Sequence, residues 1–80
     1  MEITKYTVER DCKDCVTLIT AISMDRFDKD TMYEHEYRFG KDELSEAISQ
    51  YNRLSTVEGV DVFMNVFDEH NNLVTSMSNI

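Results

Sequence analysis

The sequence predicts an α+β domain in which one helix packs on one face of a mostly antiparallel sheet of about five strands, in the order β-β-β-α-β-β. Three observations predict it. Apolar residues recur with helical spacing in one segment, residues 41–54. They alternate with a period of two before and after that segment. The connections are short enough for hairpins, and 80 residues leave room for a single domain, residues 1–80.

The predicted helix, residues 41–54, has one apolar stripe. Its members are Leu44, Ala47, Ile48, Tyr51 and Leu54. Gly40 precedes the first turn as the N-cap, and Asp42 and Glu43 place negative charge where the helix dipole favours it. Glu43 stands at the third helical position, so its carboxylate can also reach back to the cap.

Two segments alternate most clearly and are predicted as strong strands, residues 15–24 and 60–67. The other strands are predicted at residues 3–10, 32–38 and 73–77. Residues 68–72 are rich in Asp and Asn, which suits a hairpin loop. We expect a core made of Val16, Leu18, Ile22, Leu44, Ile48, Tyr51, Leu54, Val60, Val62 and Met64.

One helix covers only one face of such a sheet, so some aromatic side chains of the strands are not covered by it. These are Tyr33, Tyr37, Phe39, Phe63 and Phe67. One expectation is that curvature of the sheet buries these rings. Alternatively they form a contact surface or a dimer interface, because contiguous exposed apolar patches usually mark partners.

Acidic side chains dominate the composition, with 16 Asp and Glu against 8 Lys and Arg and a formal net charge of −8. This charge argues against direct binding to nucleic acid, because phosphates repel such a protein. The N-terminal residues lack a signal-peptide pattern, and no apolar run approaches the length of a membrane span. We therefore expect a cytoplasmic protein that does not contact membranes.

Cys12 and Cys15 form a CxxC pair. We expect two thiols in a hairpin turn between the first two strands, since a reducing compartment keeps cysteines reduced. Two zinc arrangements are the alternatives: one with His35 and His70 as further ligands, and one in which two chains share an ion. A structural zinc site needs four ligands, and no spacing here supplies them. We therefore predict no metal and no cofactor.

The segment 25–30 has the oxygen density of a calcium loop but lacks the glycine and the glutamate that such a loop needs at fixed offsets. A solvated turn is the expected structure. No serine or cysteine has a partnering histidine and acid at recognisable spacing, and no glycine-rich phosphate loop is present. We therefore predict no catalytic residues and no enzyme activity.

Eight of the sixteen acids fall within residues 25–46, on a predicted turn, a strand and a helix start. They are Asp25, Asp28, Asp30, Glu34, Glu36, Asp42, Glu43 and Glu46. Consecutive elements are usually adjacent in space, so we expect these carboxylates to raise the local negative potential together. They are the predicted residues for binding a basic partner protein. The alternative is an ordinary solvated face.

A strongly acidic chain of this size, built from short strands and one helix, resembles the small phage-encoded inhibitors of host nucleases, including anti-CRISPR proteins and DNA mimics. The resemblance covers size, charge and architecture but no motif, so no functional residue is carried over from it. It implies a stoichiometric, non-catalytic inhibitor whose target is a basic nuclease or another nucleic-acid-binding protein. The competing class is a homodimeric structural or regulatory module that uses the aromatic sheet face, with or without zinc bridging Cys12 and Cys15.

Overall fold

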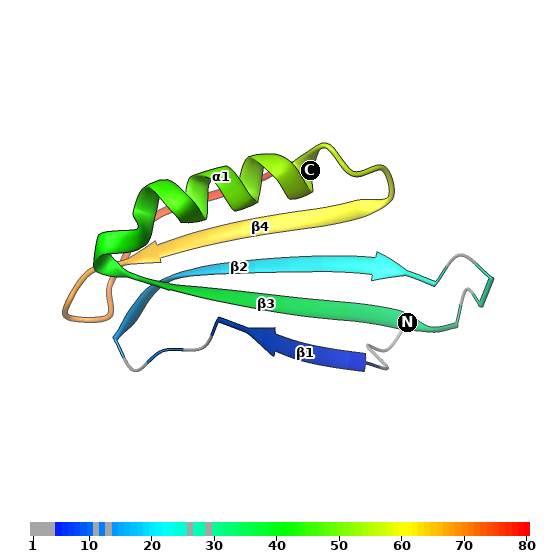
Figure 1. The fold of residues 1–80 in the computed structure, drawn as a ribbon, viewed down its shortest axis with the longest axis horizontal. Helices are drawn as coiled ribbons and strands as arrows, with labels where there is room; N and C mark the ends of the chain where they lie inside the picture. Colours follow the sequence, from blue (N-terminus) through cyan, green and yellow to red (C-terminus); the bar gives the residue numbers. More distant parts are fainter. Residues whose placement is uncertain (1–4, 11, 13, 26, 29) are drawn as a thin grey trace.

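The computed structural model describes residues 5–10, 12, 14–25, 27–28 and 30–80. These residues form an α+β fold with one α-helix on a five-stranded sheet (Figure 1). The strands are β1 (Lys5–Glu9), β2 (Cys15–Met24), β3 (Met32–Gly40), β4 (Val60–Phe67) and β5 (Leu73–Ser78). A 3₁₀ turn, η1 (Lys41–Glu43), leads into the helix α1 (Leu44–Ser55). The predicted class and the order of elements along the chain are confirmed.

The sheet is mixed rather than mostly antiparallel, which corrects the prediction. Its strand order is β1-β3-β2-β4-β5. β1 runs parallel to β3, with Tyr6 opposite Glu34, whereas the other three pairings are antiparallel. β2 is ten residues long and pairs along both of its edges, with β3 and with β4. No edge of β2 is left for β1, so the predicted hairpin between the first two strands is wrong.

The loop between β4 and β5 is the predicted Asx-rich hairpin connection. Oδ1 of Asp68 accepts hydrogen bonds from the backbone amides of His70 and Asn72, both at 2.9 Å. These bonds, that of Asn72 above all, hold the pKa of Asp68 below its usual range. Asn71 has a φ of 63°, a conformation that asparagine tolerates well. The acid therefore shapes this loop.

The helix start follows the prediction closely. The amide of Gly40 donates to Oε1 of Glu43 at 3.0 Å, so the carboxylate reaches back to the cap as expected. The buried stripe is rotated, however. Ala47 is fully buried and Tyr51 and Leu54 pack against the core, whereas the other two members of the predicted stripe are exposed. Those exposed residues are Leu44 and Ile48.

The core lies between α1 and the central strands. Its buried members are Ile19, Phe39, Ala47, Val62 and Met64, with Thr17 and Ala21 beside them. On β2 this is the side opposite to the predicted one, so Val16, Leu18 and Ile22 face away from the helix. Both sides of β2 carry apolar residues, so the alternation alone does not choose between them. The covered side carries the smaller ones, which let the helix approach closely.

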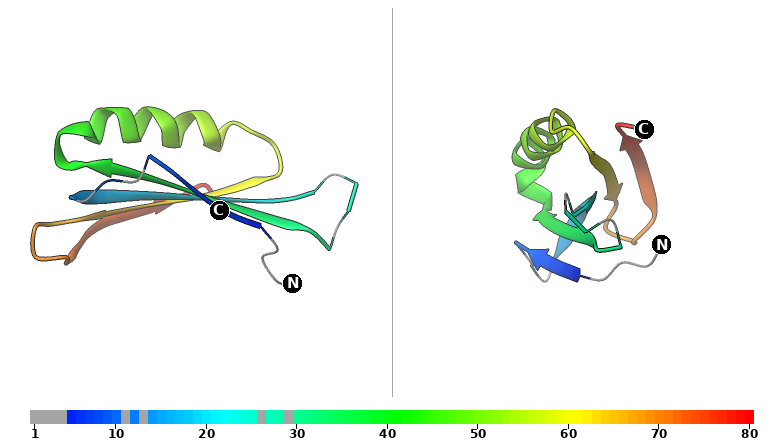
Figure 2. Two further views of the ribbon diagram at one scale, coloured as in Figure 1. Left: turned by 60° about the horizontal axis from the view of Figure 1, so that its bottom comes forward. Right: turned by 90° about the vertical axis from the view of Figure 1, so that its right-hand side faces the viewer.

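The helix covers only part of the sheet. Within the described residues, α1 contacts β2, β3 and β4 but neither edge strand. Figure 2 shows the helix on one side of the sheet, and in the described part of the chain no element lies on the other side. We call that other side the open face. None of the described helices is long and apolar enough to cross a membrane.

A pair of substitutions tests which side of β2 is buried. Ile19 is fully buried, so Ile19→Ala should lower the free energy of unfolding by about 2–5 kcal/mol. Ile48→Ala removes the same atoms from an exposed helix position and should cost less than about 1 kcal/mol. Urea denaturation followed by circular dichroism measures both. Equal losses, or a larger loss for Ile48→Ala, would contradict this core.

Candidate functional site

The eight predicted partner-binding acids fall on two parts of the structure. Five belong to the hairpin formed by β2 and β3: Asp25, Asp28, Asp30, Glu34 and Glu36. Three lie around the helix start: Asp42, Glu43 and Glu46. β3 has nine residues, so its ends lie roughly 26 Å apart at about 3.3 Å per residue. The acids of the hairpin tip are thus separated from those of the helix start by the length of β3, with Glu36 midway between them.

The hairpin tip is ordered by its own carboxylates. Oδ1 of Asp25 accepts from the amides of Phe27 and Asp28 at 2.9 and 3.1 Å. Its Oδ2 accepts from the Tyr33 hydroxyl at 2.6 Å. The Tyr33 bond and the two amide bonds hold the pKa of Asp25 below its usual range, and the same carboxylate raises the pKa of Tyr33. Asp25 therefore keeps its charge while it fixes the turn.

Asp28 closes the rest of the turn. Its Oδ1 accepts from the amide of Asp30 at 3.1 Å, and its Oδ2 accepts from the Thr31 hydroxyl at 2.8 Å. Its backbone carbonyl accepts from the amide of Thr31 at 3.0 Å. The predicted solvated turn is thus present, with carboxylates bonded to the protein's own backbone.

Phe27 stands at this tip with 93% of its surface exposed. The hairpin extends past the end of α1, so the tip projects from the body of the protein (Figure 1). Phe27 was not among the binding residues predicted from the sequence. The sequence did contain one signal: Phe27 is a single aromatic residue in an acidic segment between two predicted strands, and it belongs to neither of them.

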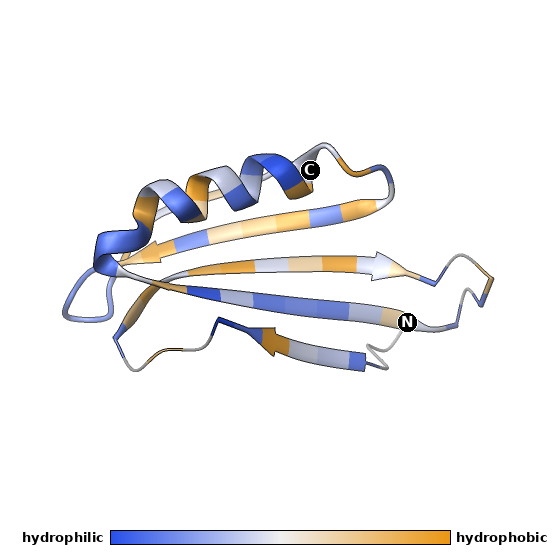
Figure 3. Ribbon diagram, viewed as in Figure 1, coloured by the Kyte–Doolittle hydropathy of each residue, from blue (hydrophilic) through white to orange (hydrophobic). Residues whose placement is uncertain are grey.

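Glu34 and Glu36 lie on β3 and point to the open face. The register places Glu34 opposite Ile22 of β2 and opposite Tyr6 of β1. Glu36 accepts a hydrogen bond from the Tyr6 hydroxyl and one from Nε of Arg38, the latter at 2.7 Å. The Glu36 carboxylate raises the pKa of Tyr6. Glu36 is thus already engaged within the chain. It lies on β3, whose ribbon is mostly hydrophilic, whereas that of β4, on the far side of β2, is mostly hydrophobic (Figure 3).

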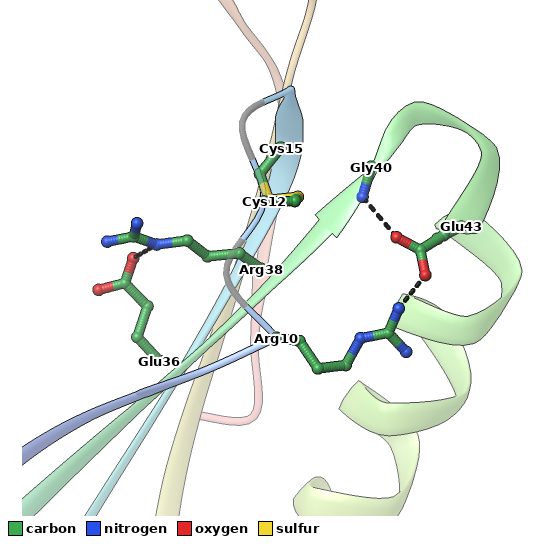
Figure 4. The surroundings of a disulfide bond; sticks show 7 residues. All are labelled: Arg10, Cys12, Cys15, Glu36, Arg38, Gly40 and Glu43. Carbon is green, nitrogen blue, oxygen red and sulfur yellow. Dashed lines mark hydrogen bonds and ion pairs between the residues drawn. A yellow bond between two sulfur atoms is a disulfide. The ribbon is translucent and has the colours of Figure 1, made fainter.

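Two of the three acids at the helix start, Glu43 and Glu46, are tied to Arg10. The guanidinium of Arg10 forms ion pairs with Glu43 and, at 3.0 Å, with Glu46. It also lies over the Phe39 ring, 4.7 Å from the centroid. Figure 4 shows Glu43 between Arg10 and the amide of Gly40. These two glutamates therefore fasten the helix start to the chain that follows β1, which is a structural task.

Four apolar side chains run along the open face, and we call them the apolar strip: Leu18, Ile22, Phe63 and Phe67. Each is partly exposed. The register sets Leu18 opposite Asn65 and Ile22 opposite Asp61, so polar side chains flank the strip. The sequence did not predict the apolar strip, because Leu18 and Ile22 were expected in the core beneath the helix.

The predicted aromatic sheet face does not exist as one surface. Tyr33, Tyr37 and Phe39 alternate onto the side that carries the helix, where Phe39 is buried and Tyr37 packs against the core. Burial raises the pKa of Tyr37. Phe63 and Phe67 point the other way, into the apolar strip. The even-odd alternation of the two strands separates the sets.

Cys12 and Cys15 form a disulfide, with their Cα atoms 5.4 Å apart (Figure 4). This corrects the expectation of two thiols. Their spacing of three residues in the sequence brings the Cα atoms within the range of about 4.4–6.8 Å that disulfides allow. Among the described residues, no three His, Cys, Asp or Glu side chains are grouped so that they could hold a metal ion.

The sequence matches no protein-family model, and comparisons with curated proteins and with solved structures give no significant match. Function therefore has to be inferred from the residues and geometry of this chain.

Removal of the disulfide should weaken the protein without unfolding it. The bond closes a loop of only four residues, so its loss should lower the free energy of unfolding by about 2 kcal/mol. The double variant Cys12→Ser/Cys15→Ser and the wild type under dithiothreitol should give the same reduced value in urea denaturation, with an unchanged circular dichroism spectrum at low urea. A loss of the folded spectrum in either sample would show that the disulfide is required for folding.

Proposed function

We propose that this protein is a non-catalytic inhibitor that binds a basic protein surface through its β2–β3 hairpin. The observation that carries the proposal is Phe27, which is 93% exposed on a turn ordered by Asp25 and Asp28. An apolar ring of this size in water is unfavourable, and aromatic residues, Phe included, are enriched in the buried cores of protein interfaces.

The ordered turn supports the use of Phe27 as an anchor. Binding normally loses free energy when a loop is immobilised at the interface. Here the carboxylates of Asp25 and Asp28 already accept hydrogen bonds from the backbone amides of Phe27, Asp28 and Asp30. Little further ordering is needed when Phe27 enters a pocket, so more of the contact energy appears as affinity.

The charge of the hairpin supports a basic partner. Residues 25–36 carry five acidic side chains against two basic ones, Asp28 and Asp30 are exposed, and the whole chain carries a formal charge of −8. Such a field accelerates encounter with a positive surface and repels acidic ones. A groove that normally binds phosphates is a surface of this kind. We therefore propose a nuclease or another nucleic-acid-binding protein as the partner, with carboxylates taking the place of phosphates.

The alternative function, a homodimer formed face to face through the sheet, is favoured by the apolar strip. Glu34, Glu36 and Asp61 border that strip, however. A face-to-face dimer would bring these like charges close to their own copies, which costs free energy. The open face is therefore better suited to a basic partner than to a second copy. We propose that it makes additional contacts with the partner that the hairpin tip binds.

The test measures binding and inhibition against a panel of purified nucleases that includes an RNA-guided nuclease, with double-stranded DNA as competitor. Phe27→Ala should weaken binding at least about tenfold, because it removes the anchor. The control Val57→Ala truncates an exposed apolar side chain in the loop between α1 and β4, outside the hairpin, and should change nothing. The affinity should fall as salt rises and as DNA is added.

Charge-matched variants separate the hairpin acids from net charge. Asp30→Asn/Glu34→Gln and Glu58→Gln/Glu69→Gln each remove two negative charges, and only the first pair lies on the hairpin. The first should slow association several-fold more than the second. Equal effects of the two pairs, with full binding by Phe27→Ala, would contradict the proposal. So would failure of the wild type to bind any member of the panel.

A further inference from the structure

In the part of the chain that the structure describes, β5 is an edge strand of the sheet. Among the described residues, β5 pairs with β4 on one side, and no strand lies on the other. All six of its residues are exposed, and they include no charged residue and no proline. Proteins normally protect such an edge with charges, prolines or very short strands, because its unpaired amides and carbonyls attract other strands.

The C-terminal part of β5 lies in regular register against β4 from Thr75 to Ser78, after an irregularity in the pairing next to Phe67. The amide of Asn79 donates to the carbonyl of Val62 at 3.2 Å. The Asn79 side chain accepts from the amide of Val62 at 2.8 Å and donates to the carbonyl of Val60 at 2.9 Å. Peptide groups alternate in direction along a strand, so the amides and carbonyls of Ser76 and Ser78 point to the outer edge. The edge is thus extended, ordered and ready to pair.

The two edges of the sheet differ in their protection. β1, at the opposite edge, is five residues long and carries Lys5 and Glu9, and Arg10 follows it. β5 carries no charge in a chain whose formal charge is −8. Two copies repel each other over most of their surfaces, and the β5 edge is where they can approach with no carboxylate in the contacting strands. This charge distribution favours a second copy as the occupant.

We propose that two copies of the protein pair antiparallel through the outer edges of β5, so that their sheets join into one continuous sheet about a two-fold axis. Antiparallel pairing is self-complementary, because the same groups donate and accept on both strands. Ser76 exchanges amide and carbonyl hydrogen bonds with Ser78 of the partner subunit, and the axis passes beside Met77. The hairpin tips and both open faces stay uncovered.

Apolar side chains on the edge supply the burial that this pairing needs. Leu73, Val74, Met77 and Ile80 are exposed, with Val74 at 63% and Ile80 at 78%. The helix does not contact β5 in the described chain, so Met77 lies uncovered on the side that carries α1. At the axis it meets Met77 of the partner subunit. Pairing therefore removes apolar surface from water as well as satisfying the backbone groups.

The test is the molar mass in solution, measured by light scattering after size exclusion across a range of protein concentrations. The wild type should move from the 9.4 kDa of one chain toward twice that mass as concentration rises. Dimerisation should strengthen with salt, because screening weakens the repulsion between two acidic copies. This is the opposite of the salt dependence expected for a basic partner, so the two interactions are tested separately.

Two variants locate the contact. Met77→Lys sets like charges opposite each other at the axis, and Ser76→Pro removes an amide that points outward; both should be monomeric. The control Thr7→Lys adds the same charge to the β1 edge and should dimerise like the wild type. Circular dichroism checks that each variant folds. In the wild type, the Ser76 and Ser78 amides should exchange with deuterium more slowly as concentration rises, while Asn79 is protected throughout.

Three results would overturn the proposal. One is a wild type that stays monomeric at the highest concentration and salt. Another is a dimer that Met77→Lys leaves intact and Phe63→Lys abolishes, because this would place the contact on the open face. The third is exchange of the Ser76 and Ser78 amides that does not change with concentration.

Discussion

Burial of β2 between two neighbouring strands and one helix is the interaction on which the rest of the structure depends. β2 pairs along both edges, and Ile19 at its centre is fully buried beneath α1. Because both edges are occupied, β1 has to pair with β3 and β5 with β4, at the two margins of the sheet. A helix of twelve residues then covers the three central strands only. The open face, the projecting hairpin and the bare β5 edge all follow from that geometry.

Much of the fold could be predicted from local patterns. The ranges of β2 and β4 match their periodicity, and Glu43 caps Gly40 as its position indicates. The side of β2 that faces the helix could not be predicted, because Leu18 and Ile19 are both apolar and the alternation is ambiguous. The pairing of β1 was equally inaccessible, since it depends on which strands occupy the centre of the sheet rather than on the sequence of β1.

The candidate site was predictable in part. Clustering of acids along the sequence placed five carboxylates on the segment that forms the β2–β3 hairpin. Sequence proximity could not reveal that Glu43 and Glu46 are engaged by Arg10, more than thirty residues earlier. Phe27 was overlooked because an exposed aromatic residue has no periodic signature. Its significance depends on the three-dimensional fact that Asp25 and Asp28 fix the turn beneath it.

The central claim is that β2 presents one buried side and one side available for contact. It is tested most directly by methyl-detected NMR of dilute protein with a soluble gadolinium chelate as relaxation agent. The methyl groups of Ile19 and Val62 should keep narrow signals, because the helix shields them. Those of Leu18 and Ile22, which are partly exposed on the open face, should broaden strongly. Strong broadening of Ile19 together with protection of Leu18 and Ile22 would contradict the account.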